Sequence, residues 1–180
     1  MMIKIQTNKA FYIKLGFQGA YESECLTNPG IARIGWSDVP RSMLDSEADQ
    51  IIWKAIKSLL NNQCKSKGMA TNQTNQLKNF FTSGPSVLWI TFYSNRLYWC
   101  FLDPKVEISG DNTKFRRTLD GWHCTDIQDK ELTFNRLSGS LSTLKGFLGT
   151  ICAVHELDYL LKKINGETSP EEDRVENAKI

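Results

Sequence analysis

The chain has 180 residues, of which 41% are hydrophobic and 23% are charged, and its formal net charge is +2. It is long enough for one substantial core and short for two, and no apolar run approaches the roughly 18 residues that cross a bilayer. The composition argues against a membrane-spanning or wholly disordered protein, so we expect one soluble domain over residues 1–166.

The C-terminal tail differs in charge from the rest of the chain. Residues 167–180 carry five acidic and two basic side chains, which leaves a formal charge of +5 on the remainder. We expect this acidic tail to be disordered. The mildly basic body is compatible with nucleic-acid binding without requiring it.

The N-terminus and the cysteines indicate a cytoplasmic protein. The first residues, MMIKIQTNKAFYIKLGF, alternate lysines and polar residues with apolar ones and do not resemble a signal peptide. The five cysteines are odd in number and widely spaced, so free thiols are a better interpretation than a disulfide framework.

The N-terminal half is predicted to mix strands and helices. In chain order we expect a strand over 10–17, a helix over 21–26, a strand over 31–36, a long helix over 46–64 and a shorter helix over 73–81. The long helix has apolar residues at helical spacing, and Ser46 with Asp49 resembles a capping box at its start. Its apolar stripe is expected to be core.

A β-hairpin is the strongest local signal. The stretch GPSVLWITFYSNRLYWCFLDP contains two β-rich runs, over 87–93 and 96–102, joined by Ser94 and Asn95. Alternation places Trp89 and Leu88 on opposite faces of the first run, and both faces are apolar. The hairpin is therefore predicted to be central and covered on both sides.

The C-terminal half has weaker signals. We expect a strand over 106–108, an irregular stretch through RRTLDGWHCTD, a strand over 150–154 and a helix over 156–165 that ends at Gly166. Strands and helices in this irregular order favour the α+β class.

Signatures of catalysis are weak in this sequence. The two histidines, His123 and His155, lie in no triad or nucleophile-elbow motif, and no glycine-rich phosphate loop is present. Zinc would require both histidines to converge with Cys124 and Cys152. Asp103-Pro104-Lys105 has the acid-x-lysine order of a magnesium-dependent nuclease core, which remains an alternative.

The aromatic residues carry the strongest functional signal. Trp36 and Trp122 each follow a glycine beside a polar loop, where strand packing does not bury a ring, and each has a carboxylate nearby. A ring beside a carboxylate suits stacking on a nucleobase and reading of its edge. Trp99 is interpreted as structural, whereas Trp89 is equally compatible with core and site.

The hairpin, with the short polar helix before it, resembles the central hairpin of PUA-like domains, especially their EVE and YTH branch. The stretches FYIKLGFQGAYESECLTNPGIARIGW and TLDGWHCTDI are similar to reader modules of modification-dependent restriction systems. This resemblance implies a small mixed β-barrel flanked by helices, whose aromatic cage receives a flipped, methylated base. The opening of the EVE branch, a Tyr-Trp dipeptide followed by an acid-proline element, is replaced here by FYIKLGFQG.

The resemblance implies a non-catalytic module that recognises a modified base, in DNA rather than RNA, in a restriction or defence context. Any nuclease activity would belong to a partner or fused domain, and no cofactor, metal or membrane is expected. An RNA-binding PUA-like module is the alternative. The expected base-binding residues are Trp36, Trp122, Trp89, Tyr93, Asp38 and Asp120, with Asn95 as a further candidate, and the expected phosphate-binding residues are Arg33, Arg41, Lys114, Arg116 and Arg117.

Overall fold

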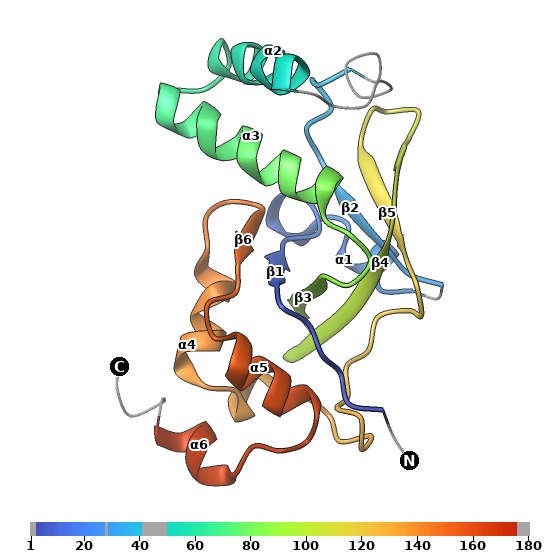
Figure 1. Cartoon of the computed structure of the whole chain (residues 1–180), viewed down its shortest axis with the longest axis vertical. Coiled ribbons are helices and arrows are strands. Elements are labelled where there is room, and N and C mark those ends of the chain that lie inside the picture. Colours follow the sequence, from blue (N-terminus) through green and yellow to red (C-terminus); the bar gives the residue numbers. More distant parts are fainter. Residues whose placement is uncertain (1–2, 28, 41–49, 176–180) are drawn as a thin grey trace.

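Residues 3–27, 29–40 and 50–175 are described by a computed structural model of the chain, shown in Figure 1. At its centre is a six-stranded sheet with the order β2-β5-β4-β3-β1-β6. The strands are β1 (Ala10–Ile13), β2 (Ile31–Ile34), β3 (Leu88–Tyr93), β4 (Arg96–Ile108), β5 (Lys114–Thr118) and β6 (Ile151–Ala153). β1 and β3 are parallel, and the other neighbours are antiparallel.

The α+β class is confirmed, but a closed barrel is not shown. Within the described residues β2 and β6 lie at the two edges of an open sheet. The helices are α1 (Glu22–Cys25), α2 (Gln50–Asn61), α3 (Lys67–Thr82), α4 (Gly139–Ser142), α5 (Leu157–Ile164) and α6 (Pro170–Val175), with short 3-10 turns η1 (Phe17–Gly19), η3 (Phe134–Arg136) and η4 (Thr143–Gly146). None of the described helices has the length and apolarity needed to cross a membrane.

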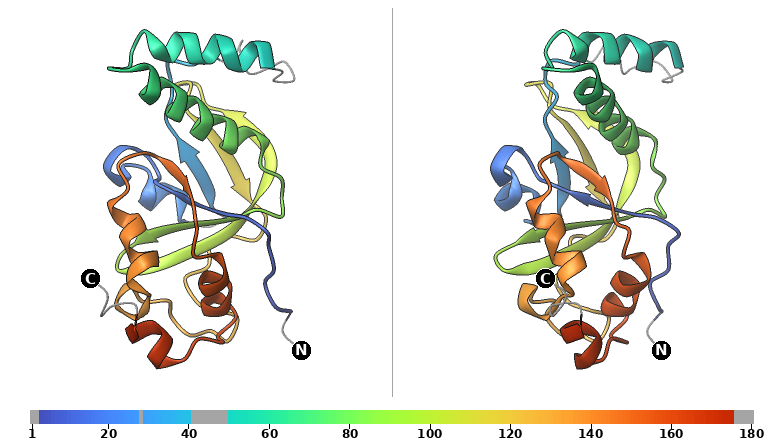
Figure 2. Two further views of the ribbon diagram at one scale, coloured as in Figure 1. Left: turned by 60° about the vertical axis from the view of Figure 1, so that its left-hand side comes forward. Right: turned by 90° about the vertical axis from the view of Figure 1, so that its left-hand side faces the viewer.

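Two cores cover the two faces of the sheet, as predicted for the hairpin. Trp89 packs into a core with α2 and α3, whereas its neighbour Leu88 packs into a second core with α4 and α5. Figure 2 shows α2 and α3 at one end of the molecule and α4 to α6 at the other in both views. The turn at Ser94 and Asn95 has positive φ at both residues (48° and 64°), as a tight hairpin turn requires.

Helix α3 begins earlier than the sequence signals indicate. We expected a polar connection before residue 73, but the helix starts at Lys67, where the Ser66 hydroxyl accepts a hydrogen bond from the Met69 amide (3.2 Å). The first turns of α3 are polar, so hydrophobic periodicity gives no signal there. The capping box expected at Ser46 and Asp49 lies outside the described residues.

Strand β4 is longer than expected and β5 was missed. β4 runs without interruption from Arg96 to Ile108, with a register shift between Leu102 and Val106 that accommodates Pro104. The stretch RRTLDGWHCTD, which begins at Arg116, was interpreted as irregular, and no strand was expected over residues 114–118. These residues form β5, which pairs with both β4 and β2.

The acidic tail is ordered as far as it is described. We expected disorder from residue 167, but residues 170–175 form α6. The Asp173 carboxylate accepts hydrogen bonds from the Tyr159 hydroxyl and the Lys163 ammonium group of α5. These contacts join α6 to the preceding helix α5, across 14 and 10 residues, and the composition of the tail does not reveal them.

Candidate functional site

Trp36 and Trp122 do not form one cage. Trp36 follows the end of β2, where Ile34 pairs with Lys114, whereas the Trp122 indole donates to the carbonyl of Ile31 at the other end of that strand (2.9 Å). Three residues of extended backbone separate these ends, or about 10 Å. Both indoles also pack against the first core, so the structure gives no support to the predicted pair as one cage.

The other predicted base-binding residues are dispersed. Trp89 is fully buried, with its ring centroid 5.0 Å from that of Phe11. Tyr93 is 37% exposed at the far end of the hairpin, and Asn95 lies in the turn itself. Asp38 is exposed in the turn after β2. Tyr93 and Asn95 therefore lie near each other at the hairpin turn, apart from Trp89 in the core and Asp38 after β2.

The described members of the predicted phosphate-binding set form hydrogen bonds or ion pairs with other groups of the protein. Lys114 and Arg116 are completely buried and donate to backbone carbonyls. Arg33 donates to Glu24 (2.7 Å) and Ser109, and Arg117 donates to Glu107 (2.7 Å). Arg41 lies outside the described residues. The predicted phosphate contacts are therefore wrong for Lys114 and Arg116, whose donors face the interior.

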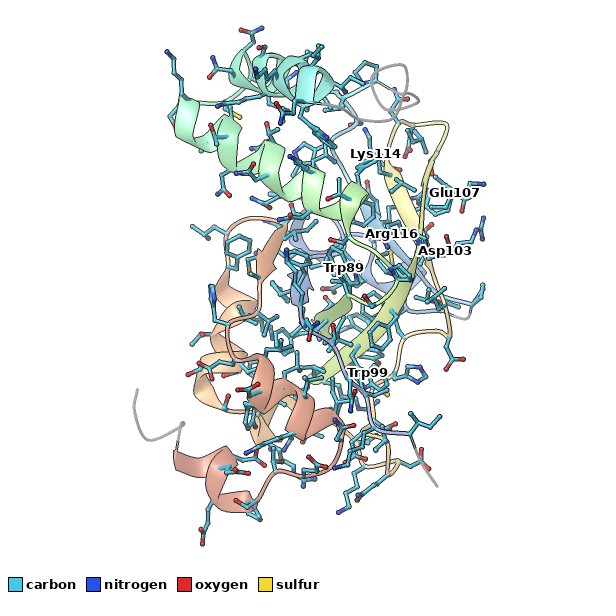
Figure 3. The ribbon with its side chains drawn as sticks, viewed as in Figure 1. Trp89, Trp99, Asp103, Glu107, Lys114 and Arg116 are labelled. Atoms are coloured by element: carbon cyan, nitrogen blue, oxygen red, sulfur yellow. The ribbon has the colours of Figure 1, made fainter. Side chains whose placement is uncertain are left out.

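Asp120 lines a different cavity, of about 420 Å³, on the face of the sheet that carries the second core. We call it the Trp99–His123 pocket. Its walls come from four segments: Ile5 and Gln6 before β1, Pro85 and Ser86 before β3, Trp99 and Phe101 on β4, and Leu119, Asp120, Gly121 and His123 after β5. Figure 3 shows Trp99 on the half of β4 that is remote from α2 and α3. The volume of the Trp99–His123 pocket lies within the usual range of small-molecule sites, about 300–1,000 Å³.

The backbone fixes the aromatic wall of this pocket. Trp99 and His123 exchange both backbone hydrogen bonds (2.8 and 2.9 Å), which continues the sheet beyond β5. Their rings stack with centroids 4.6 Å apart at 29°. The Trp99 indole donates to the carbonyl of Thr125 (2.8 Å), and this hydrogen bond fixes the orientation of the ring.

A second set of bonds fixes the N-terminal wall. The Asn165 amide at the end of α5 accepts from the Ile5 N–H (2.8 Å) and donates to the Ile5 carbonyl (2.9 Å). The Thr7 hydroxyl donates to the carbonyl of Ser86 (2.7 Å). The segment before β1 is thereby tied both to α5 and to the residues that precede β3, and the pocket is preformed.

The rim of the pocket is polar and its walls are apolar. Asp120 is exposed, and one carboxylate oxygen lies 3.4 Å from His123 Nε2. Phe101 is half-buried and Leu119 is 53% exposed, so an apolar surface is available to a ligand. Such a site can hold a flat, partly apolar ring and accept a hydrogen bond from its edge.

The loop that the sequence singled out for Trp122 contributes His123 to the Trp99–His123 pocket. Trp122 attracted attention, but in this extended segment successive side chains point to opposite faces. Trp122 therefore faces the first core, and His123 faces the pocket. Phe101, Leu119 and His123 were missed. The period-two alternation with Trp99 is the signal that could have identified Phe101. Trp99 is 6% exposed, in line with its structural interpretation, yet it also lines the pocket.

The metal alternatives find little geometric support. The Asp103 carboxylate accepts from the Lys105 amide (2.8 Å) within the irregular part of β4. His123 lies beside β4, whereas Cys152 lies on β6, with β3 and β1 between these strands. Over residues 3–27, 29–40 and 50–175 no group of three or more His, Cys, Asp or Glu side chains is placed to hold a metal ion.

Comparison with known proteins does not assign the chain to a family. No protein-family model, no curated protein and no solved structure matches it.

Proposed function

We propose that the protein is a non-catalytic nucleic-acid-binding module that recognises a modified base, with methylated DNA as its preferred target. The base would enter the Trp99–His123 pocket. The observation that carries this proposal is a preformed aromatic and apolar pocket with a carboxylate at its rim. The proposal includes a PUA-like relationship, supported by the polar helix α3 followed by the aromatic β3–β4 hairpin.

The energetics of base flipping are compatible with this pocket. Extruding a base costs a few kcal/mol, and stacking against aromatic side chains returns about 1–3 kcal/mol per base. Phe101 and the apolar side chain of Leu119 supply the surface for the base and for a methyl group, whose burial adds about 0.8 kcal/mol. The methyl group alone therefore discriminates weakly.

Asp120 supplies the second element of recognition. Its carboxylate accepts hydrogen bonds only, so it favours a base that presents an exocyclic amino group. Cytosine and adenine present such a group, and guanine presents one on its minor-groove edge. His123 beside Asp120 limits the directions from which the edge of a base can approach.

A matched pair of leucine variants tests the pocket. Leu119→Asp is expected to weaken binding of a methylated oligonucleotide at least about tenfold, because it places a charge in the apolar wall and repels phosphate. Leu148→Asp is the control, since Leu148 is 98% exposed and outside this pocket. Affinities are measured by fluorescence anisotropy at one fixed salt concentration, because phosphate contacts are salt-dependent.

The choice of oligonucleotides decides between targets. Methylated and unmethylated DNA of one sequence, each single-stranded and duplex, are compared with structured RNA. Preference for methylated DNA that Leu119→Asp abolishes supports the proposal, and preference for RNA would favour an RNA-binding module. Equal affinity of wild type and Leu119→Asp for every oligonucleotide would refute the pocket as the binding site.

A further inference from the structure

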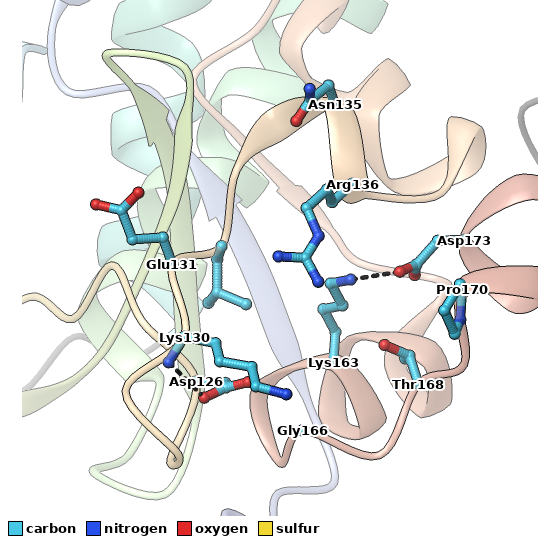
Figure 4. A pocket seen from close by; sticks show the side chains of 11 residues that line it. Asp126, Lys130, Glu131, Asn135, Arg136, Lys163, Gly166, Thr168, Pro170 and Asp173 are labelled. Carbon is cyan, nitrogen blue, oxygen red and sulfur yellow. Dashed lines mark hydrogen bonds and ion pairs between the residues drawn. The ribbon is translucent and has the colours of Figure 1, made fainter.

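A second cavity, of about 250 Å³, lies under the ordered part of the acidic tail, and cations from three elements line it. Lys130 comes from the loop after β5, Arg136 ends η3, and Lys163 lies in the last turn of α5. Figure 4 shows these three side chains reaching into one hollow, which Thr168 and Pro170 border. We call it the tail pocket.

Two of these cations have unused donors. Lys130 and Arg136 are both exposed. Among the hydrogen bonds and ion pairs of the described residues, neither the ammonium group of Lys130 nor the guanidinium group of Arg136 has a partner. Lys163 is different, because it is nearly buried and pairs with Asp173 at 2.6 Å. The pocket thus already accommodates one anionic group beside a cation.

The carboxylates that line the tail pocket are engaged with other groups. Asp126 is buried and accepts from the backbone amides of Gln128 and Lys130 (2.8 and 3.0 Å). Glu131 pairs with Arg96 of β4 at 2.7 Å. Asp173 pairs with Lys163 and also accepts from the Tyr159 hydroxyl. Each acid bonds to a group other than the side chains of Lys130 and Arg136.

We propose that the tail pocket is an oxyanion site that binds a phosphate ester or polyphosphate. Arg136 offers a planar guanidinium fork that matches a pair of phosphate oxygens, and Lys130 adds a point charge on the neighbouring wall. The hydroxyl of Thr168 is a further donor at the border. A cavity of about 250 Å³ exceeds the needs of one phosphate group and suits a diphosphate.

Titration with inorganic pyrophosphate at one low ionic strength tests this site on the full chain. Binding is followed by isothermal calorimetry and by shifts of the backbone amide resonances of residues 130–136. The expected result is saturable binding, with Arg136→Gln and Lys130→Gln each raising the Kd about tenfold. Lys145→Gln is the matched control, because Lys145 lies over the Phe134 ring and outside the tail pocket.

A competition arm separates two sources of the phosphate group. A short single-stranded oligonucleotide that displaces pyrophosphate, and binds more weakly to Arg136→Gln, identifies a phosphodiester backbone. Pyrophosphate binding that the oligonucleotide leaves unchanged identifies a free phosphate ester. The inference is overturned if pyrophosphate does not bind, or if Arg136→Gln and Lys145→Gln bind it as the wild type does. Leu119→Asp should leave pyrophosphate binding unchanged, so this test is independent of the base-binding proposal.

Discussion

Replacement of Arg116 by methionine is expected to lower the free energy of unfolding by about 2–4 kcal/mol. Arg116 is completely buried and donates to three backbone carbonyls, those of Asp103 (2.7 Å), Phe80 (2.9 Å) and Leu102 (3.3 Å). It thereby connects the irregular part of β4 to the C-terminal turn of α3, and Figure 3 shows it between these elements. Its guanidinium group also lies 5.8 Å from the ring centroid of Phe80.

Two opposing contributions determine how much Arg116→Met changes the free energy of unfolding. Burial lowers the pKa of Arg116 from its ordinary value to about 10, which corresponds to roughly 3 kcal/mol of native-state free energy that methionine would recover. Against this, methionine removes the side-chain donor from three carbonyls, of which the contacts to Phe80 and Leu102 are buried, at about 1–3 kcal/mol each, and it fills less volume beside Trp89. The loss is expected to exceed the gain.

The neighbouring residue provides the control. Arg117 is 58% exposed and pairs with Glu107 on the surface, so Arg117→Met is expected to cost less than about 1 kcal/mol. Both variants are compared by urea denaturation at one pH. If they are equally stable, Arg116 does not organise the interior. If Arg116→Met instead folds normally and loses DNA affinity, the original phosphate-binding assignment would be restored.

β5 shows why part of this fold could not be predicted. Its sequence, Lys-Phe-Arg-Arg-Thr, has three basic residues and gave no strand signal, yet Lys114 and Arg116 are buried and Phe115 is half-buried. The cause lies in distant segments, because loops and an irregular strand bring carbonyls inward that need donors. The β3–β4 hairpin, in contrast, was predicted correctly, because its period-two pattern and its turn residues all lie within the hairpin itself.

The predicted cage of Trp36 and Trp122 finds no support in the structure for a related reason. The Gly-Trp pairs were selected because they neighbour loops, yet the antiparallel pairing of β2 with β5 sets them at opposite ends of one ladder. Strand order determines which loops meet, and a single sequence does not provide it. Asp120, one of the expected base-binding residues, lines the Trp99–His123 pocket, and its neighbours there, Phe101 and His123, became visible only with the order β5-β4-β3.

Lys114 gives a second large effect, which depends on pH. Its ammonium group is completely buried and donates to the carbonyls of Val39 (2.8 Å), Asn112 (2.6 Å) and Trp36. Burial lowers its pKa from 10.5 to about 8, although the negative charges of Asp38 and Asp111 partly oppose this. Between these two pH values the native state releases a proton that the unfolded state retains, so stability from this group rises with pH.

We therefore expect the wild type to gain stability relative to Lys114→Met between pH 8 and pH 10.5, by roughly 3 kcal/mol over the whole interval. The absolute curves are less informative, because burial raises the pKa of Cys25 and of Cys152 to about 11, which makes stability fall at alkaline pH. Both proteins contain these thiols, so the difference between the curves isolates Lys114.

Urea denaturation under reducing conditions at pH 7, 8, 9 and 10 measures this difference. Lys105→Met is the control, because Lys105 is exposed, and its curve is expected to run parallel to that of the wild type. Parallel curves for Lys114→Met as well would show that the buried amine keeps its ordinary pKa. The three carbonyl contacts would then compensate fully for the loss of solvent around a buried charge, and the anchoring of the Trp36 loop to β5 would be independent of pH.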